Sequence, residues 1–195
     1  MKIFIFLTFF SLLGITSYST FPESNPYFPL SEGSTWVYEE IKNNDTTLAL
    51  AFVYICGDSI VNNNRYKMLC NQSLKNPKNQ KALLRVSHDT VFGFTGENDE
   101  IILIAKRGAI WADTLRGYHQ YITIVSKVID DNLRYELDNQ MYDSVLHIQN
   151  LTTSHEFYTD DSTVTQEDFY FGKNIGLLEV KANRNRVKLK QFDIK

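Results

Sequence analysis

The histidines are the side chains of this sequence best suited to proton transfer and metal binding. A zinc site needs three or four protein ligands. His147 and His155 supply two such ligands if the chain turns back near Leu151, but no third ligand is evident. His88 and His119 stand apart from this pair. We therefore interpret His147 and His155 as exposed strand residues, and we predict neither a metal site nor a cofactor.

The other residue types that perform catalysis do not occur in a catalytic pattern. The motif G-x-S-x-G, which exposes a serine nucleophile in one class of hydrolases, does not occur. Neither the acidic segment 97–100 nor the pair Asp160-Asp161 follows the D-x-[DN]-x-[DN]-G order of a calcium loop. Two carboxylates for glycoside hydrolysis must lie roughly 5–9.5 Å apart, a distance that sequence spacing does not fix. The sequence therefore predicts no catalytic residue, and we expect a protein that is not an enzyme.

The two cysteines lie symmetrically about a turn. Residues 49–60 and 65–73 are rich in Val, Ile, Tyr and Leu, which favours two strands joined at Asn62-Asn63-Asn64. A hairpin centred on the middle Asn pairs residues whose numbers sum to 126, so Cys56 faces Cys70 directly. The Cβ atoms of opposed residues lie roughly 4.5–5.5 Å apart, which suits a disulfide. We predict this disulfide, with two buried free thiols as the alternative.

The N-terminus has the features of a secretory signal peptide. Residues 3–15 are almost wholly apolar and follow a lysine, but a membrane-spanning helix needs roughly 20 such residues. Small residues, Ser17 and Ser19, occupy the two positions that a signal peptidase reads. We expect cleavage after Ser19, a mature chain that begins at Thr20, and a periplasmic or extracellular location. An uncleaved anchor or a buried first strand is the alternative.

The remaining chain alternates apolar and polar residues in short runs between turn clusters, which predicts an antiparallel all-β domain. The expected strands are residues 35–41, 49–60, 65–73, 81–86, 90–94, 101–105, 121–129, 133–137, 145–148, 155–158, 169–171, 176–180 and 187–192. We interpret Asp130-Asp131-Asn132 as a turn. The alternative is one short helix near 130–146, because Ile129, Leu133, Leu137 and Met141 recur every four residues.

The charge of the chain argues against one class of partner, and the absence of linkers indicates a single domain. The chain has 195 residues, with 20 Lys and Arg against 23 Asp and Glu, so its net charge of −3 does not favour nucleic acid. No repeat or linker marks a second domain, so residues 20–195 form one domain. The basic residues near the C-terminus fit the solvent face of an edge strand, where lysine discourages unwanted strand pairing. They are Lys181, Arg184, Arg186, Lys188 and Lys190.

Three segments resemble a group of uncharacterised exported bacterial proteins, many of them from Bacteroidetes. Residues 28–38 match a pattern F-P-L-x-x-G-x-x-W-x-Y that follows the signal peptide in that group. Residues 142–148 and the aromatic and glycine-rich residues 170–180 resemble two later segments, in the same order. The resemblance implies a single-domain, strongly curved antiparallel sheet or open β-barrel, similar to the periplasmic lipoprotein-carrier fold. It implies no catalytic residues.

The large aromatic side chains are the candidate binding residues. Trp36 and Tyr38 lie two positions apart and so share one face of a strand, where they anchor a core or line a concave sheet. The further candidates for a core or a ligand-facing surface are Trp111, Phe169 and Phe171. If the sheet closes into an open barrel, its concave side can hold an apolar group.

We therefore expect an exported, non-enzymatic protein of the bacterial cell envelope that carries an apolar small molecule. The alternative is a structural or interaction module with a filled core, whose partner is another envelope protein. Six segments also resemble the Asp-(Ser/Thr)-apolar acceptor of protein O-glycosylation in Bacteroidetes, which predicts a glycoprotein. They begin at Asp45, Asp58, Asp89, Asp113, Asp143 and Asp161.

Overall fold

The computed structural model describes residues 25–42, 45–73, 80–116, 120–158, 162–183 and 185–195. The predicted signal peptide, residues 1–19, and the expected mature N-terminus at Thr20 lie outside these ranges. The described ranges contain twelve strands and no helix, so the all-β prediction is confirmed and residues 130–146 are not helical. Within the same ranges, no helix is long and apolar enough to cross a membrane.

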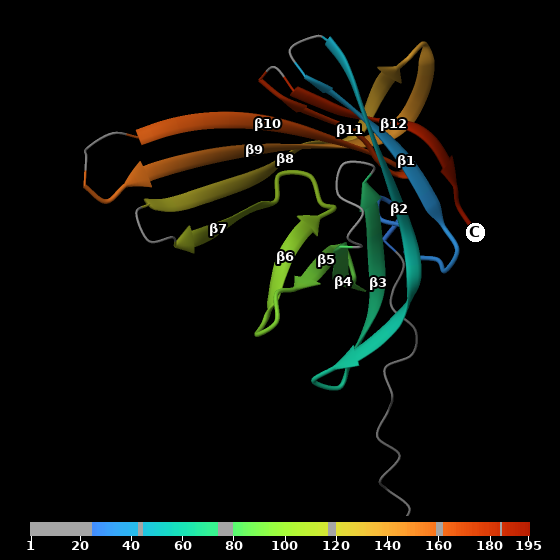
Figure 1. The fold of residues 1–195 in the computed structure, drawn as a ribbon, viewed down its shortest axis with the longest axis horizontal. Coiled ribbons are helices and arrows are strands. Elements are labelled where there is room, and N and C mark those ends of the chain that lie inside the picture. Colours follow the sequence, from blue (N-terminus) through green and yellow to red (C-terminus); the bar gives the residue numbers. More distant parts are fainter. Residues whose placement is uncertain (1–24, 43–44, 74–79, 117–119, 159–161, 184) are drawn as a thin grey trace, which may run out of the picture.

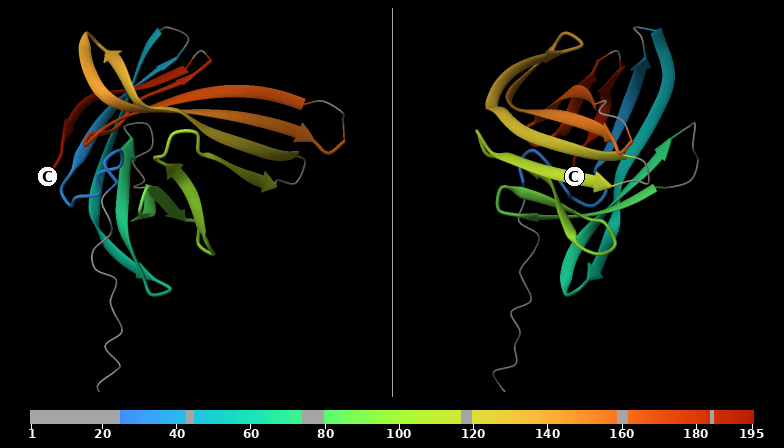
Figure 2. Two further views of the ribbon diagram at one scale, coloured as in Figure 1. Left: turned by 180° about the vertical axis from the view of Figure 1, so that it is seen from behind. Right: turned by 90° about the vertical axis from the view of Figure 1, so that its left-hand side faces the viewer.

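All twelve strands belong to one antiparallel sheet that curves strongly into an open barrel (Figure 1, Figure 2). In chain order they are β1 (Thr35–Lys42), β2 (Asp45–Val61), β3 (Asn64–Ser73), β4 (Gln80–Ser87), β5 (Thr90–Phe94), β6 (Asp99–Ile104), β7 (Ile110–Arg116), β8 (Gln120–Leu137), β9 (Gln140–Glu156), β10 (Ser162–Gly172), β11 (Gly176–Ala182) and β12 (Asn185–Asp193). The order across the sheet is β6-β5-β4-β3-β2-β1-β12-β11-β10-β9-β8-β7. The first and last strands therefore meet in the middle, and the consecutive strands β6 and β7 form the two edges.

The alternation that predicted the strands corresponds to alternating burial. In β1, Trp36 and Tyr38 are buried while Val37 between them is half-buried. Gly33, just before this strand, has a φ of +82°, and the Ser34 N–H donates to the Ser31 carbonyl at 3.1 Å. A glycine adopts this backbone conformation at low cost. The opening motif thus works as a tight turn followed by a strand that anchors the core.

The two cysteines form the predicted disulfide, with Cα atoms 5.9 Å apart, but the predicted register is wrong. Val61 pairs with Asn64 around a two-residue turn in which Asn62 and Asn63 have positive φ, as a type I′ hairpin requires. The pairing then shifts between Ile55 and Asp58, so Tyr54 and not Cys56 lies opposite Cys70.

A bulge therefore brings the two sulfurs together. Gly57 lies inside the bulge with a φ of +133°, a conformation that side-chain-bearing residues rarely adopt. Because of the bulge in β2, Cys56 lies diagonally across from Cys70 on the same face of the hairpin. The disulfide joins the two residues along this diagonal.

The β8–β9 hairpin corrects a second prediction. Asp130-Asp131-Asn132 is not a turn but part of β8, where the pairing with β9 shifts at three places. The Asp130 carboxylate accepts the Asn132 N–H at 3.0 Å, so the segment satisfies its own backbone within an irregular strand. The actual turn is Asp138-Asn139, and both residues have positive φ.

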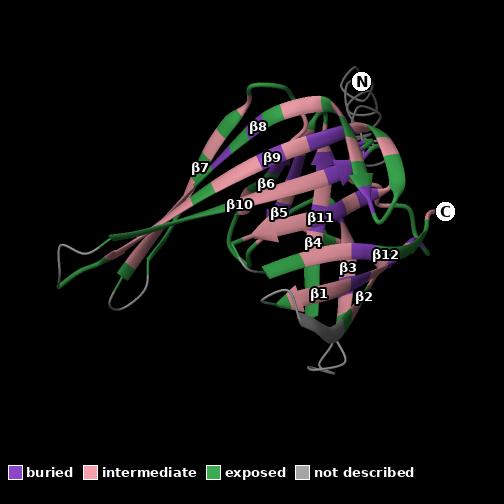
Figure 3. Cartoon of the chain, turned by 90° about the horizontal axis from the view of Figure 1, so that it is seen from above, coloured by how far each residue is buried: buried purple, intermediate pink, exposed green. Residues whose placement is uncertain are grey.

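The sheet packs around two hydrophobic clusters. Figure 3 shows where the buried residues lie along the strands. The first joins β4, β5 and β6 to β8, β9 and β10 across the interior. Its buried members are Tyr27, Val86, Val91, Leu103, Val128, Leu146, Ile148 and Phe171. The second joins β1, β2, β8, β9, β11 and β12, and its buried members are Trp36, Tyr38, Ile55, Leu137, Val145, Leu178 and Leu189. Side chains from both halves of the chain thus meet in these two clusters.

Candidate functional site

The five candidate aromatic residues divide between the two core clusters. Phe171 is a buried member of the first cluster, and Trp111 and Phe169 pack partly buried against it. Trp36 and Tyr38 belong to the second cluster. These side chains therefore do not converge on one site.

The polar atoms of the two β1 aromatics hold the β10–β11 turn. The Trp36 indole N–H donates to the Ile175 carbonyl at 2.6 Å, and the Tyr38 hydroxyl donates to the Leu177 carbonyl at 3.2 Å. Burial raises the pKa of the Tyr38 hydroxyl. A Cβ on Gly176 would lie 3.3 Å from the Trp36 ring nitrogen, so the indole packs closely on the glycine backbone. Both aromatics act as structural anchors.

His147 and His155, the two histidines considered as zinc ligands, do not lie close together. His147 and His155 both lie on β9, which runs straight through Leu151, so the expected turn there is wrong. Eight residues of extended strand separate them by roughly 26 Å. The His155 ring stacks on Tyr121, with ring centroids 4.5 Å apart. His119 lies outside the described residues.

In the described ranges, no group of three or more His, Cys, Asp or Glu side chains is arranged to hold a metal ion.

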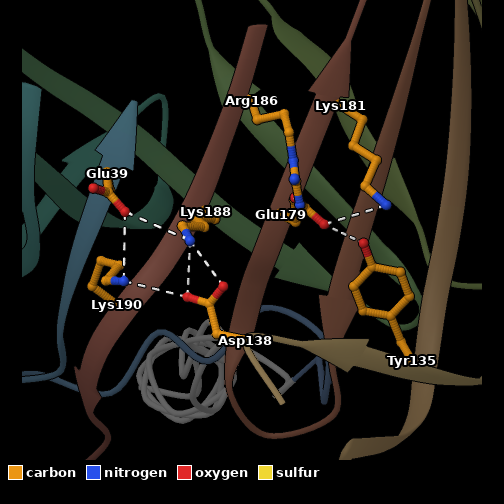
Figure 4. A network of polar contacts seen from close by, with 8 residues as sticks. All are labelled: Glu39, Tyr135, Asp138, Glu179, Lys181, Arg186, Lys188 and Lys190. Carbon is orange, nitrogen blue, oxygen red and sulfur yellow. Dashed lines mark hydrogen bonds and ion pairs between the residues drawn. The ribbon is translucent and has the colours of Figure 1, made fainter. Parts of the chain in front are cut away.

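The largest polar arrangement lies on the outer face of β10, β11 and β12. Directly opposed residues in antiparallel strands point to the same face. Tyr170 lies opposite Glu179, which lies opposite Lys188 on the next strand. Residues of the other parity, such as Ile148 and Phe169, face the first core cluster. We call the following residues the outer-face cluster (Figure 4): Glu39, Tyr135, Asp138, Glu179, Lys181, Arg186, Lys188 and Lys190.

Glu179 is the centre of this cluster and has no exposed surface. Arg186 donates to one carboxylate oxygen through Nε at 2.7 Å and through its terminal nitrogen as well. The Tyr135 hydroxyl donates to the other oxygen, and the Lys181 ammonium lies 3.5 Å from it. A buried carboxylate is tolerated only when it is paired in this way. Burial, followed by the hydrogen bond to Glu179, raises the pKa of the Tyr135 hydroxyl.

A second set of charges fixes the β8–β9 turn. The Lys188 ammonium lies 2.8 Å from one Asp138 oxygen, and the Lys190 ammonium lies 3.3 Å from the other. Both ammonium groups also approach Glu39, at 3.7 and 3.5 Å. The hydrogen bond from Lys188 lowers the pKa of Asp138 despite its partial burial, and the hydrogen bond to Asp138 raises the pKa of Lys190.

An aromatic stack continues the outer face toward β9. The Tyr170 ring stacks with Tyr135 at 4.1 Å and with His147 at 4.7 Å between centroids. The Lys181 ammonium lies 5.1 Å from the centroids of both tyrosine rings, a cation–π distance. His147 also lies 2.9 Å from Asp168.

These contacts show what the cluster does mechanically. β8 and β11 are separated in the sheet by β9 and β10, yet Tyr135 on β8 reaches Glu179 on β11. The turn residue Asp138 reaches still further, to Lys188 on β12. The end of the β8–β9 hairpin therefore bends over the outer face and is fastened there by hydrogen bonds and ion pairs.

The predicted role of the basic C-terminal residues is corrected accordingly. β12 lies between β1 and β11 in the middle of the sheet, so it is not an edge strand. Lys181, Arg186, Lys188 and Lys190 form ion pairs with Glu179, Asp138 and Glu39. Arg184 lies outside the described residues.

Sequence reasoning missed Glu179 and Tyr135. One signal was present: Glu179 is a lone acid in the apolar run Leu177-Leu178-Glu179-Val180. A carboxylate inside a buried strand requires a cationic partner. Tyr135 could not be assigned, because 44 residues separate it from Glu179.

Comparisons with known proteins identify the fold. No family model matches the chain, and no curated protein matches its sequence. Two crystal structures share the architecture. A candidate lipoprotein from Parabacteroides distasonis ATCC 8503 is similar with a TM-score of 0.60 and 8% identity, over 88% of this chain and 100% of that one. A candidate exported protein with a YmcC-like fold from Bacteroides fragilis NCTC 9343 gives a TM-score of 0.58 and 9% identity, over 87% and 100%.

Proposed function

We propose that this chain is an exported protein of the bacterial cell envelope that acts by binding a partner at its surface. Two observations support export. The N-terminal sequence has the basic, apolar and small-residue order of a signal peptide. Two proteins that share the fold are described as a candidate lipoprotein and a candidate exported protein.

The packed interior favours an interaction module over a carrier, and it is the observation that supports this choice. Val91, Leu103 and Leu146 have no exposed surface, and Val128 is 1% exposed. They come from strands on both sides of the barrel and pack into one cluster. This close packing supports an interior filled by protein side chains, as the module that we propose requires.

The pairing of the ionisable residues favours binding over catalysis. A catalytic acid or base must come within hydrogen-bond reach of the substrate. Glu179 has no exposed surface, and both of its oxygens are engaged by Arg186 and Tyr135. These groups hold the hairpin in place.

Native mass spectrometry of the purified mature protein tests this proposal against the carrier alternative. We expect the covalent mass of the chain, with its disulfide and any attached sugar, and no bound apolar molecule. A lipid or other apolar molecule that copurifies in equimolar amount would contradict the filled-core module and support the carrier.

Glycosylation remains a further part of the proposal. The acceptor residues of all six segments lie on strands of the described chain: Thr46, Ser59, Thr90, Thr114, Ser144 and Ser162. The Ser144 hydroxyl donates to Asn132 at 3.1 Å on an exposed surface. Intact-mass measurement of the protein from its native host is expected to show added hexose units, and the bare mass would contradict this prediction.

A further inference from the structure

The strand β7 is an open edge of the sheet. It pairs with β8 and, among the described strands, with no other. The chain enters it through a bulge at Gly108, whose φ is +75°. The Gly108 N–H donates to the Val128 carbonyl at 3.3 Å, and the Val128 N–H donates to the Ala109 carbonyl at 2.9 Å. This bulge sets β7 beside β8 and leaves its other side unpaired.

The register shows which backbone groups face outward. Because the Ala109 carbonyl bonds to β8, the residues of the same parity, Trp111, Asp113 and Leu115, also direct their backbone groups toward β8. Ala112 and Thr114 therefore direct theirs toward the open edge. The hydrogen bond of Thr114 agrees with this assignment, because its N–H donates to the Asp113 carboxylate at 2.7 Å and not to β8.

The side chains of β7 do not shield this edge. Ile110 is 61% exposed and Leu115 is 49% exposed. Edge strands that avoid pairing usually carry proline or lysine, and β7 contains neither. Along the strand after its entry bulge, Asp113 protects one position, because its carboxylate covers one outward N–H group.

Unpaired cations flank both ends of β7. Lys106 and Arg107 precede the strand, Arg116 ends it, and Lys127 on β8 lies opposite Ile110. All four are exposed, and none forms an ion pair within the described chain. The local charge is therefore positive on a protein whose net charge is −3.

We propose that β7 binds an extended segment of a partner protein as an added β-strand, and that the segment carries carboxylates at both ends and uncharged residues in its middle. The backbone of the segment pairs with Ala112 and Thr114, as in known strand addition. Its carboxylates meet the four cations, and its uncharged middle avoids Asp113. This inference rests on the proposed function, because it names the surface and the partner chemistry of the binding module.

A labelled peptide of sequence Glu-Glu-Val-Thr-Val-Glu-Glu tests the proposal by fluorescence anisotropy with the mature protein. We expect saturable binding that weakens with added salt, because salt screens exposed ion pairs. The peptide Lys-Lys-Val-Thr-Val-Lys-Lys is expected not to bind. Equal binding of the two peptides, or no binding of either, would overturn the proposal.

Matched variants show whether the peptide binds at the β7 edge or merely responds to the charge of the protein. Ala112→Pro removes an outward N–H without breaking the β7–β8 ladder, and Arg116→Glu reverses one flanking charge. Each is expected to weaken binding by about tenfold, the effect of one lost charged or backbone hydrogen bond. Arg134→Glu makes the same charge change at an exposed site on β8 outside the edge and is expected to bind like the wild type.

Circular dichroism and thermal unfolding of each variant show whether it is folded. Asp113→Ala provides a gain-of-binding test, because it frees the Thr114 N–H and removes the like charge.

Wild-type affinity in a folded Ala112→Pro variant would overturn the proposal. A wild-type dimer that Ala112→Pro dissociates would also overturn it, since a second copy would then occupy the edge. The two proposals can fail independently. If the peptide does not bind, the edge proposal is wrong, but the native mass measurement still tests whether the protein carries an apolar ligand.

Discussion

Glu179 illustrates how one buried charge specifies a contact between distant segments. A carboxylate without exposed surface is unfavourable unless hydrogen bonds and cations compensate its lost hydration. Arg186 on the neighbouring strand supplies one partner, and Tyr135 on the bent hairpin supplies the other. Only the arrangement in which the hairpin folds over the outer face satisfies both oxygens.

The first prediction concerns these partners. Glu179→Gln removes the charge that Arg186 and Lys181 neutralise, and we expect it to lower the free energy of unfolding by about 1–3 kcal/mol. Tyr135→Phe removes one hydroxyl and is expected to act in the same direction at the low end of this range. Urea unfolding followed by tryptophan fluorescence measures both.

Glu136→Gln, at an exposed position beside Tyr135, is the matched control and is expected to change stability by less than about 0.5 kcal/mol. If Glu179→Gln were as stable as this control, the cluster would not fasten the hairpin.

The second prediction is a loss of stability in acid. The hydrogen bond from Lys188 lowers the pKa of Asp138 below its ordinary 3.8. Burial raises the pKa of Asp168, but hydrogen bonds from His147, Gln166 and Gln149 outweigh it and leave that pKa lowered as well. Below the ordinary value the unfolded chain binds more protons than the folded one, so stability falls as the pH drops through the lowered pKa values.

Thermal unfolding between about pH 6 and pH 2.5 is expected to show a plateau above about pH 5 and a decline below about pH 4. Asp138→Asn is expected to flatten part of this decline, since the variant no longer has that carboxylate to protonate. A variant with the same acid slope as the wild type would contradict the assigned role of Asp138.

At the scale of the elements, irregular pairing determines how the hairpins are shaped. The bulge in β2 places Cys56 near Cys70, and the three shifts along β8 and β9 accompany the bend toward the outer face. Extra residues in a strand bend it and increase its twist. The disulfide and the fastened hairpin therefore both depend on places where the regular ladder is broken.

The third prediction concerns the disulfide. Closing a loop between residues 14 positions apart restricts the unfolded chain by roughly 3 kcal/mol on the chain-entropy estimate. The double variant Cys56→Ala, Cys70→Ala is expected to keep its β-sheet circular dichroism and to lose about 2–3 kcal/mol of stability. Reductant should lower the stability of the wild type but not of the variant. An unchanged wild type in reductant would contradict this expectation.

The sequence predicted the strands whose apolar and polar residue types alternate, and it failed where they do not. β7 was missed because it begins with three consecutive apolar residues, Ile110, Trp111 and Ala112, although residues 110–114 alternate in burial. Asp130-Asp131-Asn132 has the composition of a turn, but contacts with distant residues keep it in strand β8. The Tyr27 hydroxyl donates to the Asp131 carbonyl at 2.6 Å, and this distant partner stabilises the segment within β8.

At the scale of the whole molecule, the fold class was predictable and the outer-face cluster was not. Turn spacing and strand composition are local signals, and they sufficed for an antiparallel all-β domain. The cluster joins residues that are 44 and 50 positions apart, such as Tyr135 with Glu179 and Asp138 with Lys188. Such pairs follow from curvature and strand order, which local patterns do not encode.

The fourth prediction concerns export. N-terminal sequencing of the protein recovered from outside the cytoplasm is expected to begin at Thr20, because the small residues at positions 17 and 19 suit signal peptidase. A recovered chain that still begins with Met1 would contradict cleavage.

The pairing of β1 with β12 has a consequence for the order of folding. Ribosomes make the chain from its N-terminus, yet the last strand occupies the centre of the sheet. Until β12 is available, β1–β6 and β7–β11 are two separate pieces without a strand between them. The native sheet is therefore completed only after the last strand has been made, and its two halves stay unjoined through most of chain elongation.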